Sequence, residues 1–266
     1  MKEQKLETVD GTIYYWISDE WNDDKKTIFF FHGLTANHKM FYEQINYFSK
    51  EFNIIVWDAP MHGKSKEYKN FNMDKSVNII LSIIDKLNLK EIIAVGQSFG
   101  GYFVQSLIGK YKEKVSLFVS IGSTPYGIDY YSKWDYFWLK QIGWIIKCYP
   151  YKVLKKTVAE GSTCTDKGES NMIEMLDDYS KNEYVLLMKT YYGAFMDDNK
   201  DIDISCPVLI TRGEFDNVGN VVSYCESWHE NTGYPYVIIE DAGHNANVDN
   251  PDEMNNVIEN FINEYI

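Results

Sequence analysis

Short apolar runs recur along the first part of the chain, and most are followed by a longer stretch whose apolar residues lie three or four positions apart. A run of four to eight apolar residues is typical of a strand buried on both faces, and the wider spacing is typical of an amphipathic helix. We predict strands at Thr27–Phe31, Asn53–Trp57, Glu91–Val95 and Val115–Ile121, and helices at Lys39–Lys50, Asp74–Leu87 and Phe99–Tyr111.

Strands that alternate with helices predict an α/β fold, with a mostly parallel central sheet and helices on both faces. Ahead of these units, the segment Thr12–Ile17 has the composition of a strand and can pair with residues 4–9. Asp10 and Gly11 join the two segments. An Asp-Gly pair between apolar segments predicts a tight hairpin turn.

The alternation stops between about Thr124 and Asp201, where only helical spacing is found. It resumes with strands at Pro207–Thr211 and Tyr236–Ile239 and with helices around Val221–Trp228 and at Pro251–Tyr265. We therefore predict an α/β core formed by residues 1–124 and 201–266. A helical cap, or lid, is expected as an insertion at residues 125–200.

Aromatic residues are concentrated in this predicted cap. They are Tyr126, Tyr130, Tyr131, Trp134, Tyr136, Phe137, Trp138, Trp144, Tyr191, Tyr192 and Phe195. A buried ring removes roughly 150–250 Å² from water, so rings that line a pocket favour an apolar ligand. About half of these rings are expected to pack the cap against the core instead.

The net charge of −13 argues against nucleic acid and anionic membrane surfaces as partners. The first residues lack the apolar region of a secretion signal, and no apolar run is long enough to span a bilayer, so we expect a cytoplasmic protein without membrane insertion. The four cysteines show no metal-binding spacing and are expected to be reduced. Their positions are Cys148, Cys164, Cys206 and Cys225, and the last two are expected to fill space as small apolar side chains.

The segment Gly96-Gln97-Ser98-Phe99-Gly100 lies between a predicted buried strand and a predicted helix. A serine on such a sharp turn between glycines is the nucleophile elbow of a serine hydrolase. Its glycines allow close approach of strand and helix, and the helix N-terminus favours developing negative charge. An ordinary turn in which Ser98 caps the helix is the alternative interpretation.

A serine nucleophile needs a base and a group that orients the base. Asp216 follows the strand that ends near Thr211, and His244 follows the strand that ends at Ile239. Both therefore lie past carboxyl ends of strands, where sites of parallel sheets form. Taken singly, Asp216 could be a turn or helix-capping residue and His244 a solvated loop residue. The order Ser98, Asp216, His244 matches that of a known hydrolase triad.

Two backbone amides are expected to form the oxyanion hole. One is the N–H of Phe99, directly after the nucleophile. The other is the N–H of Leu34, in the loop after Thr27–Phe31, where Gly33 allows close approach. His32 is expected to be structural rather than catalytic.

These motifs together resemble the α/β-hydrolase fold family, as serine hydrolases with a helical cap. The likeness rests on residues 30–34, 58–65, 96–101, 209–216 and 243–244, in the order of the family. Many relatives have Gly or Arg near Met61, which is a small departure. Members with Asp at the nucleophile position are dehalogenases and epoxide hydrolases, and Ser98 argues against those activities. In the family, the triad acid can also follow the strand that here ends at Ile121. The residues there are Gly122, Ser123 and Thr124, none of which is a carboxylate, so Asp216 is expected to be the acid.

The resemblance implies hydrolysis of a small-to-medium apolar ester, thioester or lactone through an acyl-enzyme on Ser98, with no metal and no organic cofactor. A carbon–carbon bond hydrolase and a perhydrolase of the same fold remain alternatives, as does a non-enzymatic small-molecule sensor that keeps the triad. An aminopeptidase would need a cap carboxylate near a free amine. The available ones are Glu160, Glu169, Glu174 and Glu183, although such residues usually form a solvated face. Oligomeric state leaves no trace in the sequence.

Overall fold

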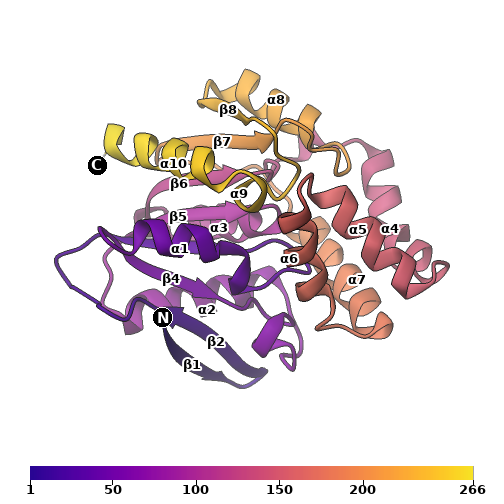
Figure 1. The fold of residues 1–266 in the computed structure, drawn as a ribbon, viewed down its shortest axis with the longest axis horizontal. Helices are drawn as coiled ribbons and strands as arrows, with labels where there is room; N and C mark the ends of the chain where they lie inside the picture. The colour runs from indigo at the N-terminus through magenta and orange to yellow at the C-terminus, as the bar shows by residue number, and fades with distance from the viewer. Residues whose placement is uncertain (266) are drawn as a thin grey trace.

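The computed structural model describes residues 1–265, and within them eight strands form one sheet in the order β1-β2-β4-β3-β5-β6-β7-β8 (Figure 1). The strands are β1 (Lys2–Thr8), β2 (Gly11–Ile17), β3 (Thr27–Phe31), β4 (Asn53–Trp57), β5 (Ile92–Gln97), β6 (Val115–Ile121), β7 (Val208–Gly213) and β8 (Tyr236–Ile239). The β1–β2 and β2–β4 pairs are antiparallel, and the other pairs are parallel. The prediction of a mostly parallel α/β sheet is confirmed.

The predicted N-terminal hairpin is present, but its turn is formed by Val9 and Asp10, one position before the predicted Asp10 and Gly11. Thr8 pairs with Gly11 at the end of the β1–β2 ladder. Gly11 has a φ of 141°, a value that L-residues with a side chain rarely adopt. A Cβ atom there would also lie 3.0 Å from the Cα atom of Tyr68. Glycine therefore fits this turn for two separate reasons.

Helices cover both faces of the sheet (Figure 1). They are α1 (Tyr42–Phe48), α2 (Met73–Lys86), α3 (Phe99–Lys110), α8 (Val221–Thr232), α9 (Ala246–Asp249) and α10 (Pro251–Tyr265). In the view of Figure 1, α1 and α10 lie in front of the strands and α2 and α3 lie behind them. The helix expected at Lys39–Lys50 is divided, because a 3₁₀ turn at His38–Phe41 precedes α1. The Asn37 side chain caps that turn by accepting a hydrogen bond from the Lys39 amide over 3.0 Å.

Four helices lie between β6 and β7 in the chain, at one end of the sheet (Figure 1). They are α4 (Lys133–Lys147), α5 (Tyr151–Ser162), α6 (Asp166–Leu176) and α7 (Lys181–Asp198). Tyr191 of α7 is fully buried and stacks on Phe71 with ring centroids 4.0 Å apart. Its hydroxyl donates a hydrogen bond to the Pro60 carbonyl. Some aromatic rings of this segment therefore pack it against the rest of the molecule, and its role as a separate cap stays a prediction.

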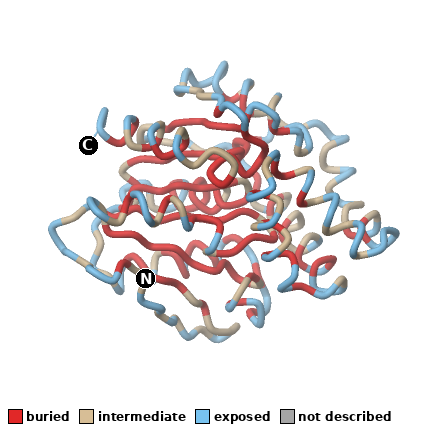
Figure 2. The backbone as a smooth tube through the Cα atoms, viewed as in Figure 1, coloured by how far each residue is buried: buried red, intermediate tan, exposed pale blue. Residues whose placement is uncertain are grey.

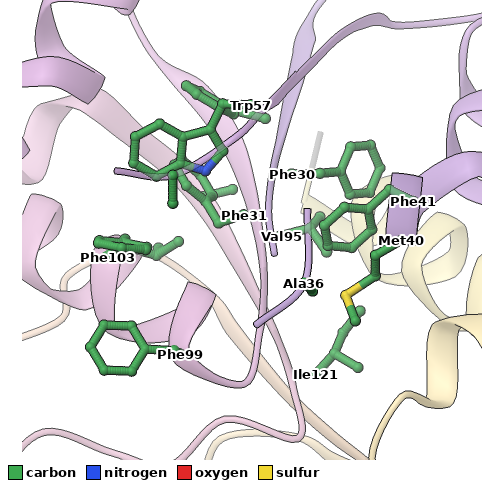
Figure 3. Packing of buried hydrophobic residues seen from close by; sticks show 14 of the residues in the cluster. Phe30, Phe31, Ala36, Met40, Phe41, Trp57, Val95, Phe99, Phe103 and Ile121 are labelled. Atoms are coloured by element: carbon green, nitrogen blue, oxygen red, sulfur yellow. The ribbon is translucent and has the colours of Figure 1, made fainter. Parts of the chain in front are cut away.

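The core is apolar on both faces of the central strands (Figure 2). Every residue of β3, β4 and β5 is buried, which explains why these strands appear in the sequence as continuous runs rather than as alternating patterns. Phe30 and Phe31 point to opposite faces of β3 (Figure 3). Phe30 packs near Phe41 with ring centroids 4.9 Å apart, and Phe31 packs near Trp57 at 5.8 Å. None of the helices described here combines the length and hydropathy needed to cross a bilayer.

Candidate active site

Ser98 lies at the point where β5 ends and α3 begins. Its backbone has φ 49° and ψ −121°, a conformation that costs a non-glycine residue about 1–3 kcal/mol. Its amide donates a hydrogen bond to the Ile121 carbonyl over 2.8 Å, which ties the turn to the neighbouring strand β6. The Ser98 side chain makes no capping hydrogen bond to α3. The alternative interpretation of Ser98 as a helix cap is therefore wrong.

The glycines beside Ser98 are required by close backbone packing. A Cβ atom on Gly96 would lie 2.7 Å from the Cα atom of Gly101. A Cβ atom on Gly100 would overlap the carbonyl oxygen of Phe31 in the adjacent strand. These contacts hold the first turn of α3 against β3 and β5 and so maintain the strained conformation of Ser98.

Asp216 and His244 form a buried pair. Asp216 lies in the loop after β7 and His244 in the loop after β8, and their side chains are joined by a hydrogen bond of 2.8 Å between Nδ1 and Oδ2. Because an ionised carboxylate only accepts, the proton of this bond lies on Nδ1, and Nε2 of His244 is left as an acceptor. Asp216 also accepts a hydrogen bond from the Val218 amide over 3.1 Å, so it fixes its own turn as well as the imidazole. His244 is 6% exposed, which excludes a solvated loop histidine.

The amides of Leu34 and Phe99 are available as donors. Phe99 is the first residue of α3, and Leu34 lies in the loop after β3. Within residues 1–265, neither backbone N–H donates a hydrogen bond to another group. Both residues line the same cavity as Ser98 and His244. The structure thus brings all five sequence-predicted site residues to one place.

Two buried histidines support the loop that carries Leu34. His32 accepts a hydrogen bond from the Ala59 amide at Nε2 over 3.0 Å, and burial lowers its pKa to about 4. His62 accepts one from the Thr35 amide at Nε2 over 3.1 Å, and burial lowers its pKa to about 3. Both rings are neutral near pH 7 and act as structural acceptors. The sequence analysis assigned no role to His62, which follows Met61, a residue with an unusual φ of 67°.

Ser98 and His244 line two cavities. The first has a volume of about 340 Å³, and its lining includes apolar side chains of α4 and α7 together with Leu34 and Phe99. The second has a volume of about 300 Å³, and its lining includes Met40, Met172 and Met188. Both cavities therefore give a bound molecule access to the same serine and histidine.

The aromatic residues of α4–α7 and the preceding loop differ in their surroundings. Tyr131, Trp138, Tyr192 and Phe195 line the first cavity. Tyr126 and Tyr191 are buried in packing. Trp134, Phe137 and Trp144 are exposed, and Trp138 is also largely exposed although it lines the cavity, which the sequence analysis did not anticipate. The periodicity of α4 could not separate these groups, because aromatic and aliphatic residues occur on more than one of its faces.

The carboxylates of α5–α7 that were considered for an aminopeptidase lie away from Ser98. As the structure describes them, Glu160, Glu169, Glu174 and Glu183 line neither of the two cavities that contain Ser98. Asp135 of α4 does line the first cavity. Its carboxylate is occupied in capping α4, where Oδ2 accepts hydrogen bonds of 2.6 Å from both the backbone and the side chain of Ser132. The geometry gives no support to an aminopeptidase.

Known proteins resemble this chain in sequence and in fold. A family model described as the alpha/beta hydrolase fold matches residues 26–153. Protein NDRG3 of Xenopus laevis is 20% identical over 98% of this chain and 75% of its own length. The 2-hydroxy-6-oxononadienedioate/2-hydroxy-6-oxononatrienedioate hydrolase of Escherichia coli is 24% identical over 79% of this chain and 76% of its own length.

Among solved structures, a thermophilic esterase from Thermogutta terrifontis superposes with a TM-score of 0.81. It is 16% identical, and the match covers 100% of this chain and 99% of that one. Such a match at low identity establishes the fold. Together with the family model and the position of Ser98 between β5 and α3, it shows that this chain has the α/β-hydrolase fold.

Proposed function

We propose that this hydrolase is a serine hydrolase that cleaves small-to-medium apolar esters, thioesters or lactones through an acyl-enzyme on Ser98. The observation that supports it most strongly is the 2.8 Å hydrogen bond between His244 and Asp216 beside a cavity that also contains Ser98. An acid that orients a base near a strained serine has the arrangement of a catalytic triad. A protein that only bound a ligand would not need the buried acid.

The chemistry follows from the protonation states. His244 Nε2 accepts the proton of the Ser98 hydroxyl while Oγ attacks the substrate carbonyl carbon. The Leu34 and Phe99 amides stabilise the oxyanion, each by about 3 kcal/mol. The protonated imidazole, stabilised by Asp216, then gives its proton to the leaving group. Water attacks the acyl-enzyme with the same histidine as base, and Ser98 regains its proton.

The lining of the cavities supports a neutral, apolar substrate. Aromatic and aliphatic side chains of α4 and α7 contribute to the lining of the first cavity, together with rings and aliphatic side chains from other elements. Neither cavity, as the described residues line it, contains a lysine or arginine. A volume of about 340 Å³ lies within the range of about 300–1,000 Å³ that is usual for small-molecule sites. The similar Thermogutta protein is named as an esterase.

Hydrolysis of an oxo-dienedioate is a second candidate, favoured by the name of the similar Escherichia coli enzyme. The triad chemistry of Ser98 is compatible with it. Its doubly anionic substrate, however, has no cationic side chain to pair with in either cavity as described here. Measuring turnover of both substrate classes by the same preparation decides between the two.

The test of the serine mechanism compares Ser98→Ala with Ser82→Ala, an exposed serine on α2. We expect Ser98→Ala to lose turnover of p-nitrophenyl butyrate and labelling by a fluorophosphonate probe, and Ser82→Ala to keep both. Mass spectrometry of the labelled wild-type protein is expected to place the phosphonate on Ser98. Undiminished turnover in Ser98→Ala would falsify the proposal. Ligand-dependent stabilisation without any turnover in the wild type would favour a sensor.

A further inference from the structure

The helix α4 exposes an unusual amount of aromatic surface. Of the fourteen large apolar residues that are exposed in residues 1–265, seven lie between positions 128 and 153. Trp134, Trp138 and Trp144 are 70%, 58% and 69% exposed, and Phe137 of the same helix is 47% exposed. Large exposed apolar patches on a single chain usually mark a surface that contacts something else. This surface lies at the end of the molecule where α4–α7 gather (Figures 1 and 2).

A row of lysines runs beside the exposed aromatic residues. Lys133, Lys140 and Lys147 are spaced by seven residues, which places them on one side of α4 after each two turns. All three are exposed, and none forms an ion pair within the part of the chain that the structure describes. The opposite side of α4 holds the buried residues Gly143 and Ile146 and packs against α7. The outer surface of α4 therefore combines aromatic residues with free positive charge.

The charge of this segment is opposite to that of the chain. Residues 133–156 contain six lysines and one aspartate, a net charge of +5, whereas the whole chain has −13. The remaining residues therefore carry −18. Two of the six lysines are paired, Lys155 with Asp177 and Lys156 with Glu160. The overall charge argued against an anionic surface as a partner, but it hides a positively charged region on α4 and α5.

We propose that the outer surface of α4 docks onto an anionic lipid surface. Tryptophan is enriched at the boundary between headgroups and acyl chains, and lysines beside it interact with lipid phosphates. A second copy of this chain fits the surface less well. Docking α4 against α4 would bring together two copies of residues 133–156, each with a net charge of +5, and they would repel each other. The helix would lie in the plane of the interface without crossing it.

Docking at this surface has a consequence for the cavity. Trp138, Ile142 and Ile145 of α4 line the first cavity beside Ser98, so α4 separates that cavity from the proposed lipid contact. An apolar molecule held in the bilayer could then reach the cavity with a short path through water. This consequence rests on the proposed function, whereas the docking itself does not depend on catalysis by Ser98.

The experiment measures binding of the full chain to vesicles, without using turnover. The vesicles contain phosphatidylcholine alone or with about one-third phosphatidylglycerol. We expect binding to the anionic vesicles with a shift of tryptophan fluorescence to shorter wavelength. Reversing the charge at three positions (Lys133→Glu, Lys140→Glu, Lys147→Glu) is expected to weaken binding to the anionic vesicles by roughly a hundredfold or more. Each lysine near such a surface contributes about five-fold to the affinity. Trp134→Gln with Trp144→Gln is expected to remove both the binding and the fluorescence shift.

Matched controls separate this site from general charge and general hydrophobicity. Lys26→Glu, Lys50→Glu and Lys112→Glu change the net charge equally at exposed positions outside α4 and are expected to bind like the wild type. Tyr42→Gln with Tyr265→Gln removes exposed aromatic side chains elsewhere and is expected to bind normally. The proposal is overturned if the wild type ignores anionic vesicles, or if the controls lose binding as much as the α4 variants. A dimer in solution that Trp134→Gln with Trp144→Gln dissociates would replace the lipid with a second copy of the chain. If Ser98→Ala is inactive but binds vesicles normally, docking and catalysis are separate properties.

Discussion

The side-chain amide of Gln97 donates a hydrogen bond to the backbone carbonyl of His244 over 3.2 Å, joining the strand that precedes the proposed nucleophile to the loop that carries the proposed base. The same amide donates to the Asn245 side chain over 3.1 Å, and Gln97 is buried. Its carbonyl oxygen occupies the space that a Cβ atom on Gly33 would need. Gln97 therefore contacts both the loop that carries His244 and the loop that carries Leu34, and we regard it as a positioning residue.

Gln97→Glu replaces a donor by a carboxylate that faces two acceptors. We expect kcat for p-nitrophenyl butyrate to fall by about tenfold to a hundredfold with little change in KM, because a shift of the base by about 1 Å has effects of that size. Gln105→Glu is the matched control, since Gln105 is also buried and donates to the Thr124 carbonyl over 3.0 Å. Both variants should lose stability in urea. If kcat per folded molecule falls equally in Gln97→Glu and Gln105→Glu, Gln97 has only a structural role.

Two aspartate–histidine pairs, each with a buried carboxylate, allow a test of the acid. Asp216→Asn keeps the shape of the side chain and its contact with the Val218 amide but favours the wrong tautomer of His244. We expect kcat to fall by about 10⁴-fold, the size of effect found for such a change in a serine protease triad. Asp58→Asn is the control. Asp58 and His38 Nδ1 are joined by a hydrogen bond of 2.7 Å, and neither residue lines the two cavities. It should lose stability and retain most of its kcat when folded. Equal losses of activity in the two variants would contradict the assignment of Asp216.

The sequence was sufficient for the sheet and for the proposed catalytic residues. The bounds of β3, β4 and β6 were predicted to the residue, because strands buried on both faces are continuous apolar runs that end in polar residues. Asp216 and His244 could be found because parallel strands present their carboxyl ends at one edge. The two residues are only 28 positions apart, and each follows the end of a predicted strand, so few residues were candidates for the acid and the base.

Contacts between distant loops could not be predicted in the same way. Gln97 and His244 are 147 positions apart, and a glutamine before the serine carries no local signal of its partner. His62 accepts from Thr35 only because two separate loops pack together. The exposed side of α4 was also unpredictable, since tryptophan is normally taken as a buried residue or a pocket residue. Each of these features depends on tertiary packing rather than on local spacing.

Two helical glycines with opposite surroundings give a prediction about stability. Gly100→Ala would place a methyl group on the carbonyl oxygen of Phe31, so we expect loss of soluble folded protein or a large drop in the urea midpoint. Gly193→Ala, within α7, meets no atom within 4 Å and is expected to raise the free energy of unfolding by up to about 1 kcal/mol. Urea titrations followed by circular dichroism measure both effects. A well-folded Gly100→Ala variant with wild-type stability would mean that the elbow is less closely packed than the structure indicates.

The buried histidines predict how stability depends on pH. The pKa of His62 is lowered by burial from an ordinary 6.5 to about 3, and that of His32 to about 4. Between these values and 6.5 the unfolded chain binds protons that the folded chain does not, so the free energy of unfolding falls as the pH decreases below 6.5. At pH 5 each ring is expected to lower the free energy of unfolding by about 2 kcal/mol relative to its value at pH 7.

His62→Gln tests this prediction because glutamine keeps an acceptor but does not titrate. The variant is expected to be less stable than the wild type at pH 7, since a buried ring that accepts from the Thr35 amide is lost. Between pH 7 and pH 5, however, its free energy of unfolding should fall by about 2 kcal/mol less than that of the wild type. His229→Gln, at an exposed position, is the control and should leave the slope unchanged. Urea titrations at several pH values in this range measure the slope, and parallel slopes for the wild type and His62→Gln would show that His62 does not titrate differently in the folded and unfolded chain.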